Sequence, residues 1–295
     1  MTLERAIPTA HHNADEFREA LTHTAAITGF SPRLIEKDYF CTLLLHDFGS
    51  QFDTGLIFKG GTSLSKVHAG FYRLSEDLDF VISVDSGIQR RVRREKMESI
   101  KEMFATVSDR HPNFRIAGPL AANNENRQYQ GQLAFLSPLT GQYETIFIDV
   151  SLREPVLTPT LRLPAKTLLR SPNASAAFIA EPLVTVLSTI ETYAEKLRAA
   201  LSRREPKIRD FYDVAYAVRA GLIDSTDTEL RRLVGQKLAI PGNGAIDLTP
   251  TKFETLSRQV STELKDVLRP EDFAHFDLKV AFELVGKIES GLIGS

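Results

Sequence analysis

The sequence of 295 residues has little of several features that would assign it to a specialised class of protein. It contains one cysteine, Cys41, which excludes an intramolecular disulfide framework and a cysteine-based zinc site. No apolar run approaches the roughly 18 to 20 residues that a membrane-spanning helix needs. The first residues, MTLERAIPTAHHNADEF, contain no apolar segment of the kind found in a secretory signal. We therefore expect a cytoplasmic protein with no membrane partner.

The signatures of two common enzyme classes are also missing. The sequence has no G-x-S-x-G elbow of a serine hydrolase. The segment GGTSLSK contains a lysine, but not at the spacing of the phosphate-binding loop G-x-x-x-x-G-K-[ST]. The 7 histidines are scattered without the spacing of metal ligands. With 42% hydrophobic and 25% charged residues, the chain is expected to form one large globular domain or two moderate ones.

The net charge of −2 argues against indiscriminate binding of nucleic acid, although it allows a local basic surface. Two clusters of basic residues occur, and each is interpreted either as a phosphate-binding surface for RNA or as a solvated helix face. The first cluster comprises Arg90, Arg91, Arg93, Arg94 and Lys96, and the second comprises Arg198, Arg203, Arg204, Lys207 and Arg209.

The stretch from Ile57 to Ile82 carries the strongest pattern in the chain. A short apolar run over 56–58 predicts a buried strand, and KGGTS then breaks it. Gly60 and Gly61 allow a tight turn and a close approach of the backbone to a ligand. A helix is expected over 64–72, and amide groups at the start of such a helix favour a phosphate.

Two carboxylates follow at Asp77 and Asp79, where a second strand is expected over 78–82. Side chains alternate along a strand, so both carboxylates project from one face, about 7 Å apart. A divalent cation would relieve their repulsion, and oxygen ligands of this kind suit Mg²⁺ or Mn²⁺ carrying substrate phosphates. Either motif alone is commonly an ordinary turn or a solvated loop. Together they form the minimal equipment for phosphoryl or nucleotidyl transfer.

The runs FKGGTSLSK and RLSEDLDF resemble the AbiEii family of nucleotidyltransferase toxins. The resemblance implies an α+β fold in which a polymerase-β-like mixed sheet is flanked by helices and followed by a C-terminal helical bundle. It implies an NTP substrate and an RNA acceptor, plausibly the 3′ end of tRNA, in a toxin–antitoxin or phage-defence system with a cognate antitoxin. The residues expected to hold the nucleotide are Lys59, Gly60, Gly61, Thr62, Ser63 and Lys66.

A third carboxylate, Asp149, ends the β-branched run expected as a strand over 145–150. Related enzymes place a third acid there, where it joins the metal site or takes a proton from the attacking hydroxyl. The alternative is a strand-end aspartate that faces solvent.

The resemblance continues in a lysine on one helix and an Arg-Asp-x-x-Asp segment on the next. It implies that Lys196 contacts the triphosphate and that Asp210 or Asp213 completes the site or anchors the lysine. The alternative for Lys196 is a helical ion pair with Glu191 or Glu195. We expect residues 1–180 to form the nucleotidyltransferase domain and 181–295 a helical lobe that contributes Lys196 and Asp210 to the cleft.

The remaining elements are expected from apolar periodicity and from helix caps. Glu36, Lys37 and Asp38 fall in the middle of an apolar helix: Lys37 could meet a phosphate, the two acids could orient site residues, or all three could form a surface ion-pair patch. Residues 154–182 are interpreted as a connection with one possible short strand at 177–179. Helices are expected over 13–28, 31–48, 88–110, 183–203, 207–220, 226–238, 252–267 and 273–288, and strands over 114–116 and 129–136.

Two further functions remain open at this stage. The protein could transfer the nucleotide to a protein hydroxyl, or it could bind RNA or a partner without turnover. The sequence does not distinguish the acceptors, and it does not identify the NTP.

Overall fold

A computed structural model describes residue 11 and residues 13–49, 54–173 and 176–292. The chain divides into two compact units, which we call the sheet unit (residues 1–155 and 160–186) and the helical unit (residues 156–159 and 187–295). The sheet unit contains a mixed β-sheet with flanking helices, and the helical unit contains only helices among its described elements. The expected α+β fold class is confirmed.

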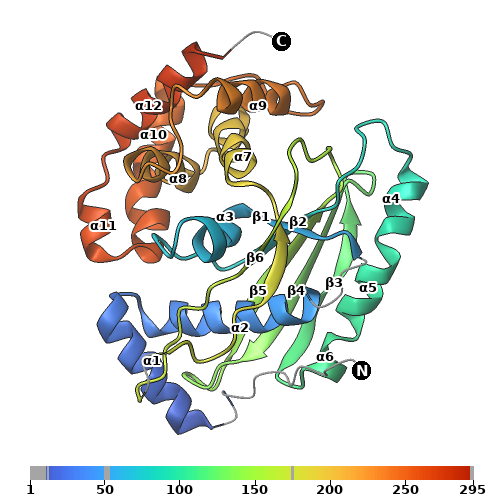
Figure 1. Cartoon of the computed structure of the whole chain (residues 1–295), viewed down its shortest axis with the longest axis vertical. Helices are drawn as coiled ribbons and strands as arrows, with labels where there is room; N and C mark the ends of the chain where they lie inside the picture. Colours follow the sequence, from blue (N-terminus) through green and yellow to red (C-terminus); the bar gives the residue numbers. More distant parts are fainter. Residues whose placement is uncertain (1–10, 12, 50–53, 174–175, 293–295) are drawn as a thin grey trace. The chain divides into compact units, whose positions relative to one another are not determined.

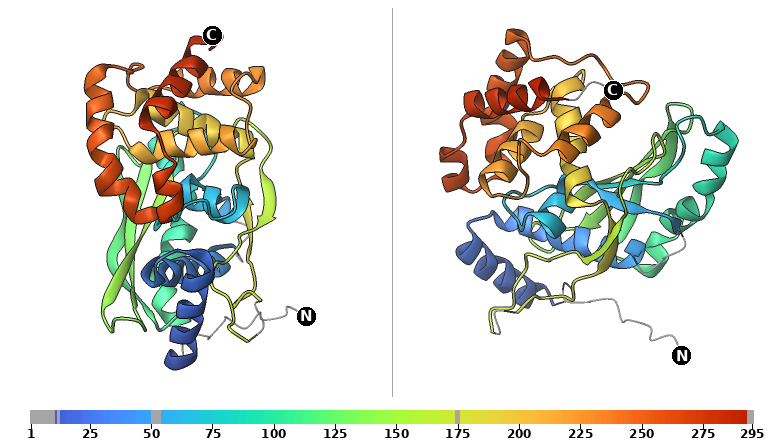
Figure 2. Two further views of the ribbon diagram at one scale, coloured as in Figure 1. Left: turned by 90° about the vertical axis from the view of Figure 1, so that its left-hand side faces the viewer. Right: turned by 45° about the horizontal axis from the view of Figure 1, so that its top comes forward.

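The sheet has seven strands in the order β3-β4-β5-β2-β1-β7-β6 within the described chain. At its centre β2 runs parallel to β5 and antiparallel to β1, and β1 runs parallel to β7. The long strands β3, β4 and β5 form an antiparallel meander beside them (Figure 2). The strands are β1 (Ile57–Lys59), β2 (Leu78–Val81), β3 (Phe114–Asn123), β4 (Gln128–Leu136), β5 (Tyr143–Ser151), β6 (Leu161–Pro164) and β7 (Leu183–Val186).

Helices of the sheet unit pack on one face of this sheet (Figure 1). The first helix begins after Asn13, whose side chain accepts a hydrogen bond from the Glu16 amide, and ends at the left-handed Gly29, as expected. The helices are α1 (Ala14–Thr28), α2 (Pro32–Gly49), α3 (Gly60–Ser63) with the π-helix Leu64–His68, α4 (Arg90–Lys96), α5 (Glu98–Ala105) and α6 (Val107–Arg110).

Strand alternation divides the residues of β2 and β5 between two faces. Phe80, Ile148 and Val150 point into the core, where α2 and α5 cover them. Phe40 of α2 stacks on Phe135 of β4 with 4.0 Å between ring centroids. The opposite face carries Asp79 and Asp149, so burial of one face sets the direction of the carboxylates on the other.

The helical unit has a core of its own. Phe211 stacks on Phe282 with 5.5 Å between centroids, and Leu197 and Val285 are fully buried. The helices are α7 (Thr189–Ser202), α8 (Ile208–Arg219), α9 (Thr228–Leu238), α10 (Pro250–Gln259), the π-helix Val260–Leu264 and 3₁₀ turn Lys265–Val267, α11 (Pro270–Ala274) and α12 (Leu278–Ser290).

Several expected boundaries are corrected by the structure. The helix expected over 183–203 begins at Thr189, because Ser188 caps it and the preceding LVTV segment pairs as β7. The expected connection contains β6, whereas 177–179 forms only an isolated bridge between Arg170 and Ala177. The helix expected over 88–110 is divided into α4, α5 and α6. Among the described residues, none of the helices combines the length and the apolar character that crossing a membrane requires.

Candidate active site

The turn after β1 and the carboxylate of Asp79 fit together closely. Gly60 has φ +77°, and a Cβ atom at this position would overlap the Asp79 Oδ2 atom. Lys59 pairs with Asp79 across β1 and β2. Glycine is required at residue 60 both by its backbone conformation and by the carboxylate that occupies the space of a side chain.

Gly61 leaves room for a second set of groups. A Cβ atom there would lie 2.7 Å from Nη2 of Arg73 and 2.9 Å from Oγ of Ser75. Arg73 is buried, and its Nη1 donates to the Leu74 carbonyl at 3.0 Å. Arg73 was not among the predicted site residues, because an arginine close to a serine and an acid in RLSED is typical of a solvated loop.

The helix after the turn begins earlier than expected. It starts at Gly60 rather than Leu64, so both glycines and Thr62 form its first turn, and it ends at His68 rather than Tyr72. The Thr62 hydroxyl donates to the Asp77 carbonyl at 2.5 Å, which joins this turn to the start of β2. Amides of the first turn carry the positive end of the peptide dipoles, where an anion is stabilised.

Lys66 lies behind the turn rather than on the surface. Its side chain is fully buried, and its Nζ atom donates to the Asp38 Oδ1 atom at 2.5 Å. Asp38 also accepts the Leu168 amide at 3.1 Å. In this structure Lys66 therefore ties the turn to α2 from a fully buried position.

The other two charged residues in the middle of α2 are also buried and paired. Glu36 accepts from the Ser137 hydroxyl at 2.7 Å and from the Leu139 amide at 3.0 Å. Lys37 lies 2.7 Å from Glu76, the residue that precedes Asp77. Lys37 therefore fixes the segment just before Asp77, whereas Glu36 holds the turn between β4 and β5, and both are buried rather than part of a surface patch.

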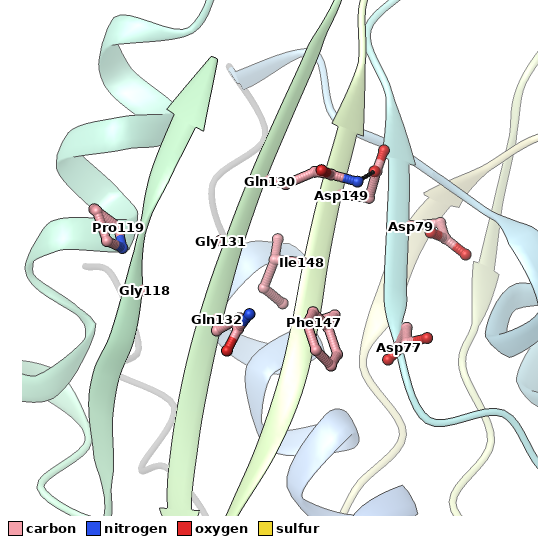
Figure 3. Close-up of a pocket in the computed structure, with 10 residues that line it drawn as sticks. All are labelled: Asp77, Asp79, Gly118, Pro119, Gln130, Gly131, Gln132, Phe147, Ile148 and Asp149. Atoms are coloured by element: carbon pink, nitrogen blue, oxygen red, sulfur yellow. Dashed lines mark hydrogen bonds between the residues drawn. The ribbon is translucent and has the colours of Figure 1, made fainter. Parts of the chain in front are cut away.

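Asp77, Asp79 and Asp149 line one cavity of about 400 Å³ on the open face of the sheet (Figure 3). Asp79 and Asp149 are paired in the register of β2 and β5. The remaining lining residues are Gly118, Pro119, Gln130, Gly131, Gln132, Phe147 and Ile148. A volume of this size lies within the range of small-molecule sites, roughly 300 to 1,000 Å³.

Two glutamines hold Asp149. The side-chain amides of Gln128 and Gln130 donate to its Oδ2 atom at 2.5 and 2.8 Å. Neither bond uses the Oδ1 atom, which leaves that atom for a proton or another ligand. Neither glutamine was among the predicted site residues, although their alternation on the strand before Asp149 was a usable signal.

The carboxylates fit a magnesium site that the substrate completes. The described part of the chain has no group of three or more His, Cys, Asp or Glu side chains gathered tightly enough to hold a metal. Mg²⁺ commonly binds one or two carboxylates together with substrate phosphates and water, rather than an all-protein cage. Asp77 and Asp79 at the edge of one cavity match that donor set.

Lys196 belongs to the helical unit, where two carboxylates hold it. Its Nζ atom lies 3.0 Å from Asp210 and 2.9 Å from Asp213. Arg203 contacts the other oxygen of Asp210 at 2.9 Å. The structure thus joins Lys196 to both candidate aspartates.

The two glutamates that were alternative partners of Lys196 both contact Lys237. Its Nζ atom lies 2.8 Å from Glu191 and 3.2 Å from Glu195. Glu191 also accepts the amides of Leu157 and Thr158 at 2.9 and 2.8 Å. This buried cluster stabilises the start of α7 and is a structural feature of the helical unit.

The basic cluster on α4 is divided between a structural and a surface role. Arg93 is buried and donates to the carbonyls of Ile88 at 2.6 Å and Glu125 at 3.2 Å. Arg90, Arg91 and Arg94 are exposed. In the second cluster Arg203, Arg204 and Lys207 are exposed, whereas Arg198 and Arg209 are partly buried.

Comparisons with known proteins identify one matching family model. The model described as nucleotidyl transferase AbiEii toxin, type IV TA system, matches residues 43–284. The protein JHP933 from Helicobacter pylori has a similar crystal structure, with 16% identity, a TM-score of 0.43, and coverage of 92% of this chain and 90% of that one. A candidate nucleotidyltransferase from H. pylori gives 15% identity, a TM-score of 0.42, and coverage of 95% and 92%. No curated protein matches the chain.

Proposed function

The chain belongs to the AbiEii family of nucleotidyltransferase toxins of type IV toxin–antitoxin systems, and we propose that it transfers a nucleotide from an NTP to the 3′ end of an RNA, with tRNA as the acceptor. One observation carries the proposal: the carboxylate of Asp79 packs against Gly60, and Asp79 lies opposite Asp149 in the register of β2 and β5. A phosphate-binding turn, a metal-binding acid and a third acid thereby meet at one place.

Different residues of the chain bind the phosphates, hold the metal ion and support the turn. The amides of Gly60 and Gly61 and the first-turn residues Thr62 and Ser63 bind the β- and γ-phosphates, and Lys59 adds positive charge. Asp77 and Asp79 would hold Mg²⁺. When bound, the ion would neutralise phosphate charge and polarise the α-phosphate. Lys66 has a supporting role in this proposal, because its buried pair with Asp38 fixes the turn.

Asp149 accepts the proton of the attacking RNA hydroxyl. The 3′ hydroxyl oxygen of the RNA attacks the α-phosphorus of the NTP, and the bond to the bridging oxygen breaks to release pyrophosphate. The hydroxyl proton passes to Asp149, whose carboxylate is oriented by Gln128 and Gln130. Positioning and charge compensation supply most of the catalysis in reactions of this type.

Lys196 is assigned to the triphosphate. Its contacts with Asp210 and Asp213 hold the ammonium group in a defined position within the helical unit. A lysine held in this way is a phosphate counter-charge that needs little reorganisation on binding. The role is a proposal that the family resemblance supports.

Growth of cells that express the protein tests this proposal. Expression of the parent should arrest growth, whereas Asp77→Ala and Asp79→Ala should relieve the arrest at equal protein levels and equal thermal stability. Asp109→Ala, which changes an acid on α6, is a matched control and should remain toxic. Normally folded Asp77→Ala and Asp79→Ala proteins that arrest growth as strongly as the parent would overturn the proposal.

A further inference from the structure

The cavity beside the carboxylates has an aromatic wall that the transfer steps above leave without a role. Phe147 lies on β5, two residues before Asp149 and on the same face, and 48% of its surface is exposed (Figure 3). A large apolar side chain that is half exposed inside a polar cavity is a candidate contact for a ligand.

A second aromatic residue on the same face shows what distinguishes Phe147. Tyr143 has the same exposure of 48%, but the guanidinium of Arg115 covers its ring at 3.3 Å from the centroid. Within the ranges that the structure describes, the ring of Phe147 has no such aromatic or cationic partner. Its face is therefore available to stack on another planar group.

The opposite strand adds a polar group beside this ring. Gln132 pairs with Phe147 across β4 and β5, and Gly118 pairs with Gln132 on β3. The Gln132 side chain makes no hydrogen bond to any residue described by the structure. Its amide offers both a donor and an acceptor, which match the hydrogen-bonding edge of a nucleobase.

We propose that this cavity binds the terminal nucleoside of the RNA acceptor, with its base stacked on Phe147, its edge bonded to Gln132 and its 3′ hydroxyl at Asp149. The inference rests on the proposed function, which requires an acceptor hydroxyl at Asp149. Strand order assigns the cavity to the acceptor rather than to the NTP. The glycine turn lies on the β1 side of β2, whereas Phe147 and Gln132 lie on the β5 and β4 side.

The surroundings of the cavity favour RNA over a protein acceptor. Arg93 bonds to the carbonyl of Glu125, which anchors α4 at the turn between β3 and β4. Gln128 follows that turn and contacts Asp149. The exposed Arg90 and Arg94 of α4 therefore lie near this end of the hairpin, on the face that the helices cover, where they can neutralise phosphates of preceding nucleotides that pass around the hairpin end.

The absence of tryptophan from the chain allows a direct binding test. Phe147→Trp places the only indole of the protein at the proposed stacking position. Tyr143→Trp is the matched control, because it lies on the same strand and face with equal exposure but outside the cavity lining. Fluorescence is measured as an RNA trinucleotide with a 3′ hydroxyl is added to each full-length protein with Mg²⁺ and without NTP.

The proposal predicts saturable quenching in the Phe147→Trp protein and at least severalfold less in Tyr143→Trp. A 3′-phosphorylated trinucleotide should bind more weakly, because its added charge would face Asp149. Equal quenching in both proteins, or none in either, would overturn the assignment. Quenching by NTP alone would place the donor base at Phe147 and would overturn it as well.

Kinetics of the transfer provide an independent measurement. Phe147→Ala should raise the KM for RNA by about tenfold, the usual cost of losing one base–aromatic stack, with an unchanged KM for NTP. Phe147→Tyr keeps the stacking face and should restore the parent value. Quenching requires no turnover. Binding at Phe147 without any transfer would therefore contradict the proposed function but still support the cavity as a nucleoside-binding site. Transfer with unchanged RNA kinetics in Phe147→Ala would contradict the pocket alone.

Discussion

The backbone of Gly60 and the carboxylate of Asp79 occupy adjoining space: a Cβ atom on residue 60 would overlap the Asp79 Oδ2 atom. Gly60 directly follows β1, Asp79 lies in the neighbouring strand β2, and the two residues are 19 positions apart in the sequence. The glycine turn and the Asp-x-Asp motif are thus one structural feature, since neither can change its position without displacing the other.

Gly60→Ala should therefore abolish transfer by displacing Asp79. Part of its effect is backbone strain, because a left-handed conformation costs a non-glycine residue about 1 to 2 kcal/mol. Gly141→Ala is the matched control: Gly141 has φ +70°, and nothing lies within 4 Å of the added Cβ. Both variants should lose similar stability in urea unfolding, whereas only Gly60→Ala should lose activity by about 100-fold or more. Equal activity of the two variants would contradict the coupling.

The two glutamines at Asp149 should act through that residue. The double variant Gln128→Ala with Gln130→Ala should lower kcat by roughly tenfold, with little change in the KM for NTP. The triple variant, with Asp149→Ala added, should lose no more kcat in total than Asp149→Ala alone, because the glutamines have no carboxylate left to orient. Fully additive losses of kcat would show that the glutamines act independently of Asp149.

Replacing Lys66 should mainly lower stability, whereas replacing Lys59 should mainly lower transfer activity. Lys66→Met leaves the carboxylate of Asp38 buried without its cation and should lower the free energy of unfolding by about 3 to 5 kcal/mol. Replacing Asp38 by Asn in the same protein should recover part of that loss. Lys59→Met should lower activity with little loss of stability, since Lys59 is only partly buried. Urea unfolding and transfer assays on the same samples compare the two sites.

The pair between Asp47 of α2 and Arg110 of α6 should produce a pH-dependent stability. Burial alone would raise the pKa of Asp47, but the nearby His111 ring and two hydrogen bonds from Arg110 lower it below its usual value of 3.8. A lowered folded pKa stabilises the protein above the unfolded value and loses that contribution as pH falls through the folded value. At pH 7, Asp47→Asn should be about 2 kcal/mol less stable than the parent.

The dependence of stability on pH tests whether the pKa of Asp47 is lowered in the folded protein. The unfolded chain protonates Asp47 near its usual pKa, whereas the folded chain keeps it charged to lower pH, so the stability difference from Asp47→Asn should narrow as pH falls below about 4. Urea unfolding of both proteins at each pH measures this difference. A constant difference over the whole range would contradict the lowered pKa.

Local sequence patterns predicted the elements that carry the carboxylates, and tertiary pairing decided what they missed. β1, β2 and β5 were expected because apolar runs with strand-forming residues mark buried strands. β7 was mistaken for the start of a helix, since LVTV continues the apolar pattern of α7 and only pairing with β1 and β6 reveals a strand. Short apolar runs do not distinguish these two states by periodicity alone.

The candidate site likewise combines residues that local sequence patterns predicted with residues that only the fold brings together. Gly60, Asp77 and Asp79 are adjacent in short motifs, and Asp149 ends a recognisable strand, so sequence could suggest them together. Gln128 and Arg73 join the site only through contacts that the fold creates. Gln128 donates to Asp149 on the neighbouring strand, and Arg73 lies next to the space that a side chain on Gly61 would fill. The buried position of Lys66 likewise depends on Asp38, which lies 28 residues away.

The most direct test of the proposed transfer is incubation of the purified protein with Mg²⁺, total RNA and each of four α-³²P-labelled NTPs. Asp77→Asn and Asp79→Asn, which keep the shape of each side chain, are run beside the parent. We expect label in a tRNA-sized band from one or two of the NTPs, and its loss in both variants. Label on protein alone, or no label on RNA although NTP binds, would contradict transfer to RNA.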